Sequence, residues 1–306
     1  MTSRTVPKIA VLLATYNGAR WLDEQLDSLF AQDGVEVQIF VNDDGSTDGT
    51  LAILDRWAAD RPVTVTQRKA GGAGQNFLGL LRDTGISGFD YVAFCDQDDI
   101  WLPTKLATAA AHLARSVAGG YSSSVTAFWE DGRELLIDKA QPQRRYDHHF
   151  ESAGPGCTFV FPAAMAIRIQ ADLRAAPAER LSQVALHDWF VYCWARSNGY
   201  GWTIDDAPLM RYRQHDSNVL GAASSAAARR DRWAKIRNGW YIGQARLLAG
   251  LVGATGLPAD YLKRPTIGRL VRLAVPFWKL RRKPTQGVVA ALALAHDYLA
   301  MRKGQP

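Results

Sequence analysis

Residues 91–105 read YVAFCDQDDIWLPTK, and this stretch contains the junction from which the fold can be worked out. Its first five residues favour burial and have the length of a strand. They run directly into three aspartates, Asp96, Asp98 and Asp99. Carboxylates this close together at the end of an apolar strand repel one another. The stretch therefore indicates a buried strand that ends at a site for positive charge.

The same alternation of apolar runs and helical patterns repeats from the start of the chain. Apolar runs of strand length occur at 8–15, 35–43, 63–68 and 91–96, and stretches with helical spacing occur at 18–34, 48–60, 74–85 and 102–116. Strands that alternate with helices form a mostly parallel sheet covered on both faces. The sequence therefore predicts an α/β fold of Rossmann-like type.

Polar residues follow each of these four predicted strands at the point where it ends. They are Thr15–Asn17, Asn42–Ser46, Gln67–Lys69 and Asp96–Asp99. One such segment alone is typical of a turn, in which Ser46 or Asp48 would cap the helix that follows. In parallel sheets, however, ligands bind at the carboxyl ends of the strands. Four polar ends at one edge predict a binding site.

Two common phosphate-binding motifs are absent from the sequence. No GxGxxG follows the first strand, and there is no GxxxxGK[ST]. The glycine-rich stretch 69–76 could bind a phosphate, but a flexible turn is the simpler interpretation. An anionic diphosphate would then need a metal ion. Asp96 and Asp98, at DxD spacing, are hard oxygen ligands suited to Mg²⁺ or Mn²⁺, and Asp99 is an additional candidate.

Length and composition favour one large α/β domain with an appendage. The chain has 306 residues, of which 47% are hydrophobic, and three widely spaced cysteines. Because no two of them form a CxxC pair, they indicate reduced thiols in a cytoplasmic compartment. The apolar run near the N-terminus is too short for a membrane span and lacks the form of a signal peptide.

The net charge of +6 is unevenly distributed along the chain. Residues 1–228 carry a net charge of −7, residues 229–283 carry +12 and residues 284–306 carry +1. A stretch of small residues at 221–232 coincides with this change and is typical of a linker. We therefore expect an α/β domain over residues 1–222 and a basic helical section over residues 223–306.

Three motifs, in this order, resemble the inverting nucleotide-sugar glycosyltransferases of family 2, which have the GT-A fold. The motifs are VLLATYNGARWLDEQLDSLFAQ (11–32), VNDDGSTDGT (41–50) and AFCDQDDIWLPTKL (93–106). The resemblance extends over residues 8–220. Within the family, DQDDIW and the later YRQHDSNVLG (212–221) are similar to bacterial rhamnosyltransferases of cell-surface polysaccharide synthesis.

The resemblance implies that the strand ends bind a nucleoside-diphosphate sugar. Thr15 and Tyr16 would lie against the nucleoside. Asp44, with Asp43 beside it, would accept a hydrogen bond from a pyrimidine imide, which is a reasonable role for a carboxylate. Further donor contacts implied in the same way are Asn17, Arg68, Asn76 and Gln97.

The resemblance also implies a divalent metal, Mg²⁺ or Mn²⁺, at the DxD motif. Asp96 and Asp98 would meet the ribose and the metal-bound diphosphate. His215 would be a third metal ligand or a phosphate contact, although an isolated histidine is more often structural. Arg211 and Arg213 flank it and could contact phosphates.

The stretch ALHDWFVYCWARSNG (185–199) has the pattern of a buried helix with Asp188 at its start. A lone aspartate there is typical of a first-turn acid that complements the helix dipole. The resemblance implies another role, because Asp188 matches the catalytic base of the family. Inversion needs one base, and Asp188 would take the proton from an acceptor hydroxyl as it attacks the anomeric carbon. The role of His187 stays open.

The resemblance places the sugar and acceptor pocket partly at GPGCTFVFPAAM (154–165). A Gly-Pro turn before a core strand explains the same residues equally well. The pocket candidates are Trp101, Gly156, Cys157, His187 and Trp189.

The basic section mixes arginines and lysines with Trp233, Trp240 and Trp278, which is typical of an interfacial amphipathic helix. Basic clusters attract anionic lipids, so we expect peripheral association with the inner face of the cell membrane. A solvated basic face and a homodimer interface are the alternatives, and the acidic body disfavours nucleic acid. The apolar stretch 285–300 contains His296 and Asp297, which predicts a packing helix rather than a span.

These features together predict transfer of a sugar to a glycan or lipid-linked glycan acceptor. The resemblance alone favours dTDP-rhamnose as donor, and UDP- and GDP-sugars stay open. A sugar-phosphate nucleotidyltransferase is the nearest rival, but residues 14–26 lack the glycine-rich activation loop that follows the first strand in those enzymes. A catalytically inactive scaffold of the same fold that docks on membranes is the second alternative.

Overall fold

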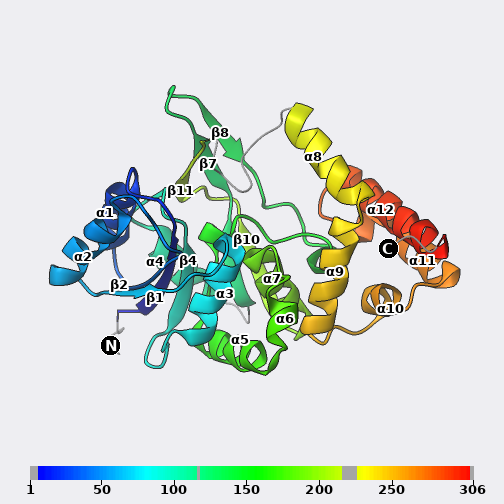
Figure 1. Ribbon diagram of the computed structural model, residues 1–306, viewed down its shortest axis with the longest axis horizontal. Coiled ribbons are helices and arrows are strands. Elements are labelled where there is room, and N and C mark those ends of the chain that lie inside the picture. Colours follow the sequence, from blue (N-terminus) through cyan, green and yellow to red (C-terminus); the bar gives the residue numbers. More distant parts are fainter. Residues whose placement is uncertain (1–5, 116–117, 216–225, 304–306) are drawn as a thin grey trace. The chain divides into compact units, whose positions relative to one another are not determined.

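The computed structural model describes residues 6–115, 118–215 and 226–303 (Figure 1). The chain divides into two compact units. The first unit contains the described residues of Met1–Ala140, Gly154–Ala176 and Tyr200–Val219, and the second contains those of Gln141–Ala153, Pro177–Gly199 and Leu220–Pro306. The predicted boundary at 222–223 lies outside the described residues.

A seven-stranded sheet forms the centre of the first unit, in the order β10-β6-β9-β4-β1-β2-β3. Strands β1 to β4 are parallel, whereas β9 runs antiparallel to both β4 and β6. The predicted mostly parallel sheet is thus confirmed. Its strands are β1 (Lys8–Thr15), β2 (Glu36–Asp43), β3 (Val63–Gln67), β4 (Tyr91–Cys95), β6 (Ala118–Ser123), β9 (Val160–Pro162) and β10 (Gly201–Asp205).

Helices cover both faces of this sheet, because side chains alternate along each strand. Val11 and Leu13 of β1 belong to a core with buried leucines of α1, α2 and α4. On the other face, Phe94 of β4 lies between Phe77 of α3 and Phe161 of β9, at centroid distances of 5.3 and 5.4 Å. There α3 and α5 pack together (Figure 1). The helices are α1 (Leu22–Phe30), α2 (Thr50–Asp60), α3 (Ala73–Asp83), α4 (Lys105–Arg115) and α5 (Ala163–Ala175).

A second sheet of the first unit has four short strands, in the order β5-β11-β7-β8. They are β5 (Ile100–Trp101), β7 (Val125–Phe128), β8 (Glu134–Ile137) and β11 (Met210–Arg213). The sequence analysis did not predict this sheet, because strands of two to four residues are too short to show a period. The antiparallel pairing of β5 with β11 brings the residues after Asp99 next to the strand that precedes His215.

The second unit is helical in its described residues. It contains η1 (Asp147–His149), α6 (Ala178–Leu181), α7 (His187–Ser197), α8 (Ala226–Arg237), α9 (Trp240–Leu251), α10 (Leu257–Lys263), α11 (Ile267–Ala274), η3 (Phe277–Lys279) and α12 (Pro284–Arg302). The stretch 285–300 forms α12, which packs by a hydrogen bond of 2.8 Å from Tyr261 Oη to the Leu294 carbonyl. In the described part of the chain, no helix has the length and apolar character that a membrane span requires.

A buried ionic cluster joins three segments of the second unit. Asp147 is fully buried, and its carboxylate lies 3.6 Å from Arg196 of α7 and 3.9 Å from Arg282 after η3. Burial raises the pKa of Asp147, but hydrogen bonds and the two arginines hold it below its ordinary value overall. Arg281 pairs with Glu151 at 3.3 Å. Part of the basic section is therefore internal structure rather than solvated surface.

Candidate functional site

The ends of β1 and β2 are fixed to each other by Asp43. The two strands are in register, with Thr15 opposite Asp43. Thr15 Oγ1 donates to the Asp43 carboxylate at 2.9 Å, and the N–H groups of Gly45 and Ser46 donate to it at 3.1 and 2.7 Å. Asp43 is 1% exposed. Its carboxylate shapes the turn that presents Asp44.

Asp44 anchors the glycine-rich loop before α3. Its carboxylate accepts hydrogen bonds from the backbone N–H groups of Ala70, Gly71 and Gly72, the last at 2.8 Å. Gly71 and Gly72 have φ values of 84° and 132°, which only glycine adopts easily. A carboxylate has about four acceptor sites. The three backbone donors therefore leave about one acceptor site of Asp44 for a nucleobase imide.

Asn76 and Arg68, two further predicted donor contacts, make internal contacts in this structure. Asn76 is 2% exposed, and it donates to the Asn42 carbonyl at 2.9 Å and accepts from the Asn42 amide at 2.8 Å. Arg68 forms an ion pair with Asp83. These contacts tie the ends of β2 and β3 to α3.

Tyr16 is held at the edge of the sheet by Gln97, the middle residue of the DxD motif. The Tyr16 N–H donates to Gln97 Oε1 at 2.8 Å, and Gln97 Nε2 donates to the Tyr16 carbonyl at 3.0 Å. A Cβ on Gly18 would lie 2.3 Å from Gln97 Oε1, so a larger residue here would displace the Gln97 amide from Tyr16. Asn17, at φ 48°, accepts a hydrogen bond of 2.8 Å from the Thr47 N–H. The Tyr16 side chain is left exposed beside the acidic loop.

The predicted metal ligands Asp98 and His215 meet although they are far apart in the sequence. His215 Nε2 lies 2.7 Å from Asp98 Oδ2, and the imidazole stacks on the Trp21 ring at 4.3 Å. Arg213 supports the same loop, because its Nε donates to the Asp98 carbonyl at 2.7 Å and its guanidinium pairs with Glu24. Sequence reasoning had offered Arg213 and Arg211 as phosphate contacts; Arg211 pairs with Glu134 at 2.9 Å.

Asp99 lies behind these residues and is fully buried. Its Oδ1 accepts from the Arg213 N–H at 3.0 Å, while its Oδ2 has no hydrogen-bond partner among the described residues. Burial, followed by the charges of Asp98 and Asp96, raises the pKa of Asp99 well above its ordinary value. Ligand atoms of Asp96, Asp99 and Cys157 lie within 4.8 Å of one another.

This set of residues fits a hard divalent cation. A buried carboxylate oxygen without a partner, next to two further carboxylates, is the kind of donor set that Mg²⁺ and Mn²⁺ prefer. Burial raises the pKa of the Cys157 thiol, so the thiol stays protonated and is a poor ligand for such an ion. Cys157 follows Gly156 in η2 (Gly156–Thr158), which leads into the core strand β9.

Lys105, which sequence reasoning did not single out, lies buried under this loop. It is 1% exposed, and its Nζ lies 3.3 Å from the centroid of the Trp101 ring. Nζ has no hydrogen-bond partner among the described residues, and burial lowers the pKa of Lys105 to about 8. Trp101, a predicted pocket residue, is itself only 2% exposed. A lysine in a helical pattern normally indicates solvent, so the sequence carried no signal of this burial.

We expect the Lys105→Met variant to be more stable than the wild type at neutral pH. Methionine has a volume similar to that of lysine but brings no charge into the buried site. Between the folded pKa of about 8 and the ordinary value of 10.5, the unfolded chain binds more protons than the folded one. Wild-type stability should therefore rise with pH in this window, and the advantage of the variant should shrink by about 3 kcal/mol. Urea unfolding near pH 8 and near pH 10.5 measures the difference in the free energy of unfolding between variant and wild type. The control is the Lys69→Met variant, because Lys69 is exposed. An advantage independent of pH would contradict the prediction.

The predicted base, Asp188, belongs to the second unit. It lies in the first turn of α7 and is 8% exposed, and its carboxylate accepts from the Trp189 N–H at 2.7 Å. Burial lowers the pKa of His187 to about 3, so this imidazole is neutral at physiological pH. The Trp189 indole donates to the His148 carbonyl at 3.1 Å and stacks on Tyr241. These contacts fix the start of α7.

Comparison with known proteins agrees with the motifs. Residues 10–173 match the sequence model of glycosyl transferase family 2. Over 286 residues the chain is 40% identical to the dTDP-rhamnosyl transferase RfbG of Shigella flexneri, and the alignment covers 92% of this chain and 98% of that protein.

Two solved structures share the fold at low sequence identity. The mannosyltransferase PcManGT from Pyrobaculum calidifontis, in complex with GDP-Man and Mn²⁺, superposes with a TM-score of 0.55 at 19% identity, over 97% of this chain and 87% of that one. TarS 1–349 of S. aureus, in complex with UDP-GlcNAc, gives 0.53 at 16% identity, over 97% and 92%. The predicted GT-A fold is thereby confirmed.

Proposed function

Because this chain belongs to glycosyltransferase family 2, we propose that it transfers rhamnose, with inversion, from dTDP-rhamnose to a glycan or lipid-linked glycan acceptor. Identity of 40% to a dTDP-rhamnosyl transferase, along almost the whole of both chains, supports this donor. The observation that carries the proposal is the edge of the sheet where Tyr16, Asp44 and the aspartates after β4 meet.

Within this site, the chain's own residues would hold the donor at both ends. The exposed Tyr16 ring would stack on the base, and Asp44 would accept from the thymine imide. Asp96, Asp98 and Asp99 would bind a divalent ion, and His215 would join them or orient Asp98. The Mn²⁺ in the structure of the related mannosyltransferase supports that ion here. When bound, the metal would neutralise charge on the departing diphosphate.

Asp188 would act on the acceptor. Its carboxylate would take the proton from the attacking hydroxyl as the oxygen approaches the anomeric carbon, on the face opposite the diphosphate. The position at the start of α7 supports this role, because the helix dipole favours the ionised carboxylate there.

Calorimetry with dTDP-rhamnose, UDP-glucose, UDP-galactose and GDP-mannose tests the donor, each with Mn²⁺ and with EDTA. We expect binding of dTDP-rhamnose that requires the metal, and affinities at least about tenfold weaker for the others, which corresponds to 1.4 kcal/mol of discrimination. If another sugar nucleotide bound tightly instead, that sugar would replace rhamnose as the proposed donor sugar, and the proposed glycosyl transfer would stand. If none of the four donors bound, the alternative of a catalytically inactive scaffold of the same fold would be favoured.

We also propose that the exposed apolar face of α11 docks on an anionic membrane at the inner face of the cell membrane. Ile267, Val271 and Val275 are 58%, 51% and 63% exposed, and their spacing of four residues places them on one side of the helix. Trp278, in the η3 turn that follows, is 47% exposed. Arg272 lies on the same helix. Apolar side chains beside arginines are what an interfacial helix needs, and the acceptor would be reached there.

Val271→Glu should lower binding to phosphatidylglycerol vesicles by about tenfold or more. The substitution removes a valine that would be buried in the membrane, and it adds a negative charge that the anionic lipids repel. Sedimentation with vesicles measures the bound fraction. The control is Ile167→Glu, an equally exposed apolar position on α5 in the first unit. Unchanged vesicle binding with a loss of dimer in light scattering would instead make this face a homodimer interface.

A further inference from the structure

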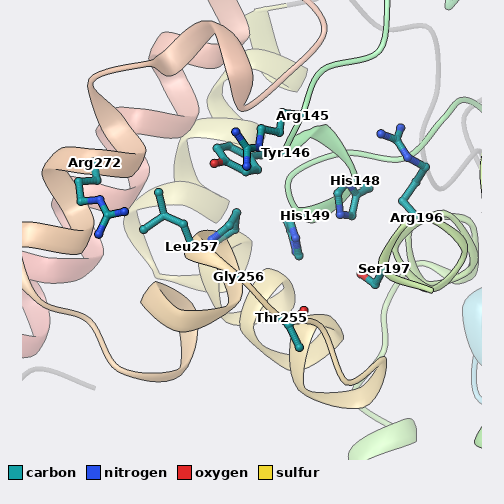
Figure 2. A pocket seen from close by; sticks show the side chains of 11 residues that line it. Arg145, Tyr146, His148, His149, Arg196, Ser197, Thr255, Gly256, Leu257 and Arg272 are labelled. Carbon is teal, nitrogen blue, oxygen red and sulfur yellow. The ribbon is translucent and has the colours of Figure 1, made fainter. Parts of the chain in front are cut away.

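A cavity of about 550 Å³ lies within the second unit, and none of its lining residues is a predicted donor-site residue (Figure 2). Its wall comes from η1 and the residues before it, from the end of α7, from the start of α10 and from α11. The side chains that matter for its chemistry are Arg145, Tyr146, His148, His149, Arg196 and Arg272.

The wall of this cavity is cationic. None of its lining residues is an aspartate or glutamate, whereas three are arginines. Arg145 and Arg272 are exposed, and neither forms an ion pair with a described residue. Figure 2 shows Arg272 and Arg196 on opposite sides of the view, with Arg145 between them beside Tyr146. All three arginines therefore line one cavity.

Arg196 is held in place from behind. Its Nη1 donates to Tyr192 Oη at 2.9 Å and lies 3.6 Å from the buried Asp147 carboxylate. About one fifth of its side chain remains exposed at the cavity. A guanidinium fixed in this way loses little conformational freedom when it binds an anion.

A buried polar group of the wall also lacks a partner. His149 is 4% exposed, and its Nδ1 has no hydrogen-bond partner among the described residues. Burial lowers the pKa of His149 well below its ordinary value, so the ring is neutral and the arginines supply the positive charge. An unpaired buried nitrogen is costly, and a bound ligand would satisfy it. This observation is independent of the arginines.

We propose that this cavity binds the phosphate or diphosphate group of the acceptor, an inference that rests on the proposed transfer to a lipid-linked glycan. A planar guanidinium group can bind two phosphate oxygens at once, and three such groups line this cavity. The volume exceeds that of a phosphate and is typical of small-molecule sites. Tyr146, Leu257 and Pro258 add apolar surface for the group attached to it.

The position of Arg196 connects this cavity to the proposed base. Arg196 and Asp188 belong to the same helix, α7, and eight residues correspond to about 12 Å along its axis. One acceptor could therefore have its phosphate in the cavity and its reacting hydroxyl at Asp188. In this arrangement the cavity selects acceptors by their anionic end, whereas Asp188 acts on the other end.

Calorimetry with inorganic pyrophosphate in EDTA tests the cavity directly on the full chain. Without metal, the acidic donor site repels this probe, so binding reports the arginines. We expect Arg145→Glu/Arg272→Glu to weaken binding by about tenfold for each lost charge-assisted hydrogen bond. Arg264→Glu is the control, because Arg264 is exposed at the end of α10 and does not line the cavity. Equal weakening in the control, or no pyrophosphate binding by the wild type, would overturn the proposal.

Kinetics then identify the source of the phosphate. The double variant should have a raised KM for a diphosphate-linked glycan, an unchanged KM for the same glycan without diphosphate, and an unchanged Kd for the donor. An unchanged KM for the first acceptor would overturn the acceptor assignment, and loss of binding to phosphatidylglycerol vesicles by Arg145→Glu alone, which leaves α11 intact, would make the cavity a lipid headgroup site. If pyrophosphate binds but no donor does, the proposed function fails and the anion site stands.

Discussion

Replacing Asp188 by asparagine is expected to lower kcat for sugar transfer by about 10² to 10⁴-fold, the range that a positioned general base supplies. Asparagine has the same shape and can still accept the hydrogen bond from the Trp189 N–H. It cannot take a proton from the acceptor. Donor affinity, measured by calorimetry, should therefore stay within about twofold of the wild type, because a change in the base alone leaves ground-state binding intact.

The matched control for this variant is Asp260→Asn. Asp260 is likewise an acid in the first turn of a helix of the second unit, but it is exposed. If the two variants lost activity equally, the effect would come from the helix dipole or from stability. If Asp188→Asn kept kcat within about tenfold of the wild type, less than a general base supplies, Asp188 would not be the base.

Asp98→Ala is expected to weaken Mn²⁺-dependent donor binding by about 100-fold or more, since even residues that only orient metal ligands contribute 10 to 100-fold to metal affinity. The substitution removes a carboxylate and also the partner of His215, which lies 2.7 Å away. A titration of donor against protein at several Mn²⁺ concentrations separates the loss of metal affinity from a loss of donor affinity.

Asp131→Ala serves as the control for Asp98→Ala. Asp131 lies in the same unit, is exposed and pairs with Arg133 at the surface, so its removal changes the net charge equally with little effect on stability. Donor binding that responds neither to Mn²⁺ nor to the loss of Asp98 would rule out the metal role of this loop.

The strands that build the donor site were predictable, because β1 to β4 are long apolar runs that end in polar residues. The sheet formed by β5, β7, β8 and β11 was not, since such short strands leave no period. This sheet nevertheless sets the geometry of the site. Its β5–β11 pairing brings His215 to Asp98, a contact that no local pattern could indicate.

Residue type also does not show which polar side chains are buried. Asp43 and Asn76 have the chemistry of ligand contacts, but they join strand ends and are 1% and 2% exposed. Arg282 contributed to the basic character read as a membrane signal, but it is 4% exposed and lies beside Asp147. Burial of a polar residue depends on distant partners, and a single sequence does not show which partners meet.

The composite second unit has a consequence for synthesis of the protein. Asp147 leaves the ribosome long before Arg282, which is its partner in the buried cluster. Because chains emerge at about 5 to 20 residues per second, this carboxylate waits for several seconds or more with Arg196 as its one cation of the cluster before Arg282 follows. The nascent chain can complete the first unit's sheet while residues 141–153 and 177–199 have contacts with each other but still lack those with residues 220–306. A chain truncated before Arg281 would therefore lack the cations that pair with Glu151 and complete the cluster at Asp147.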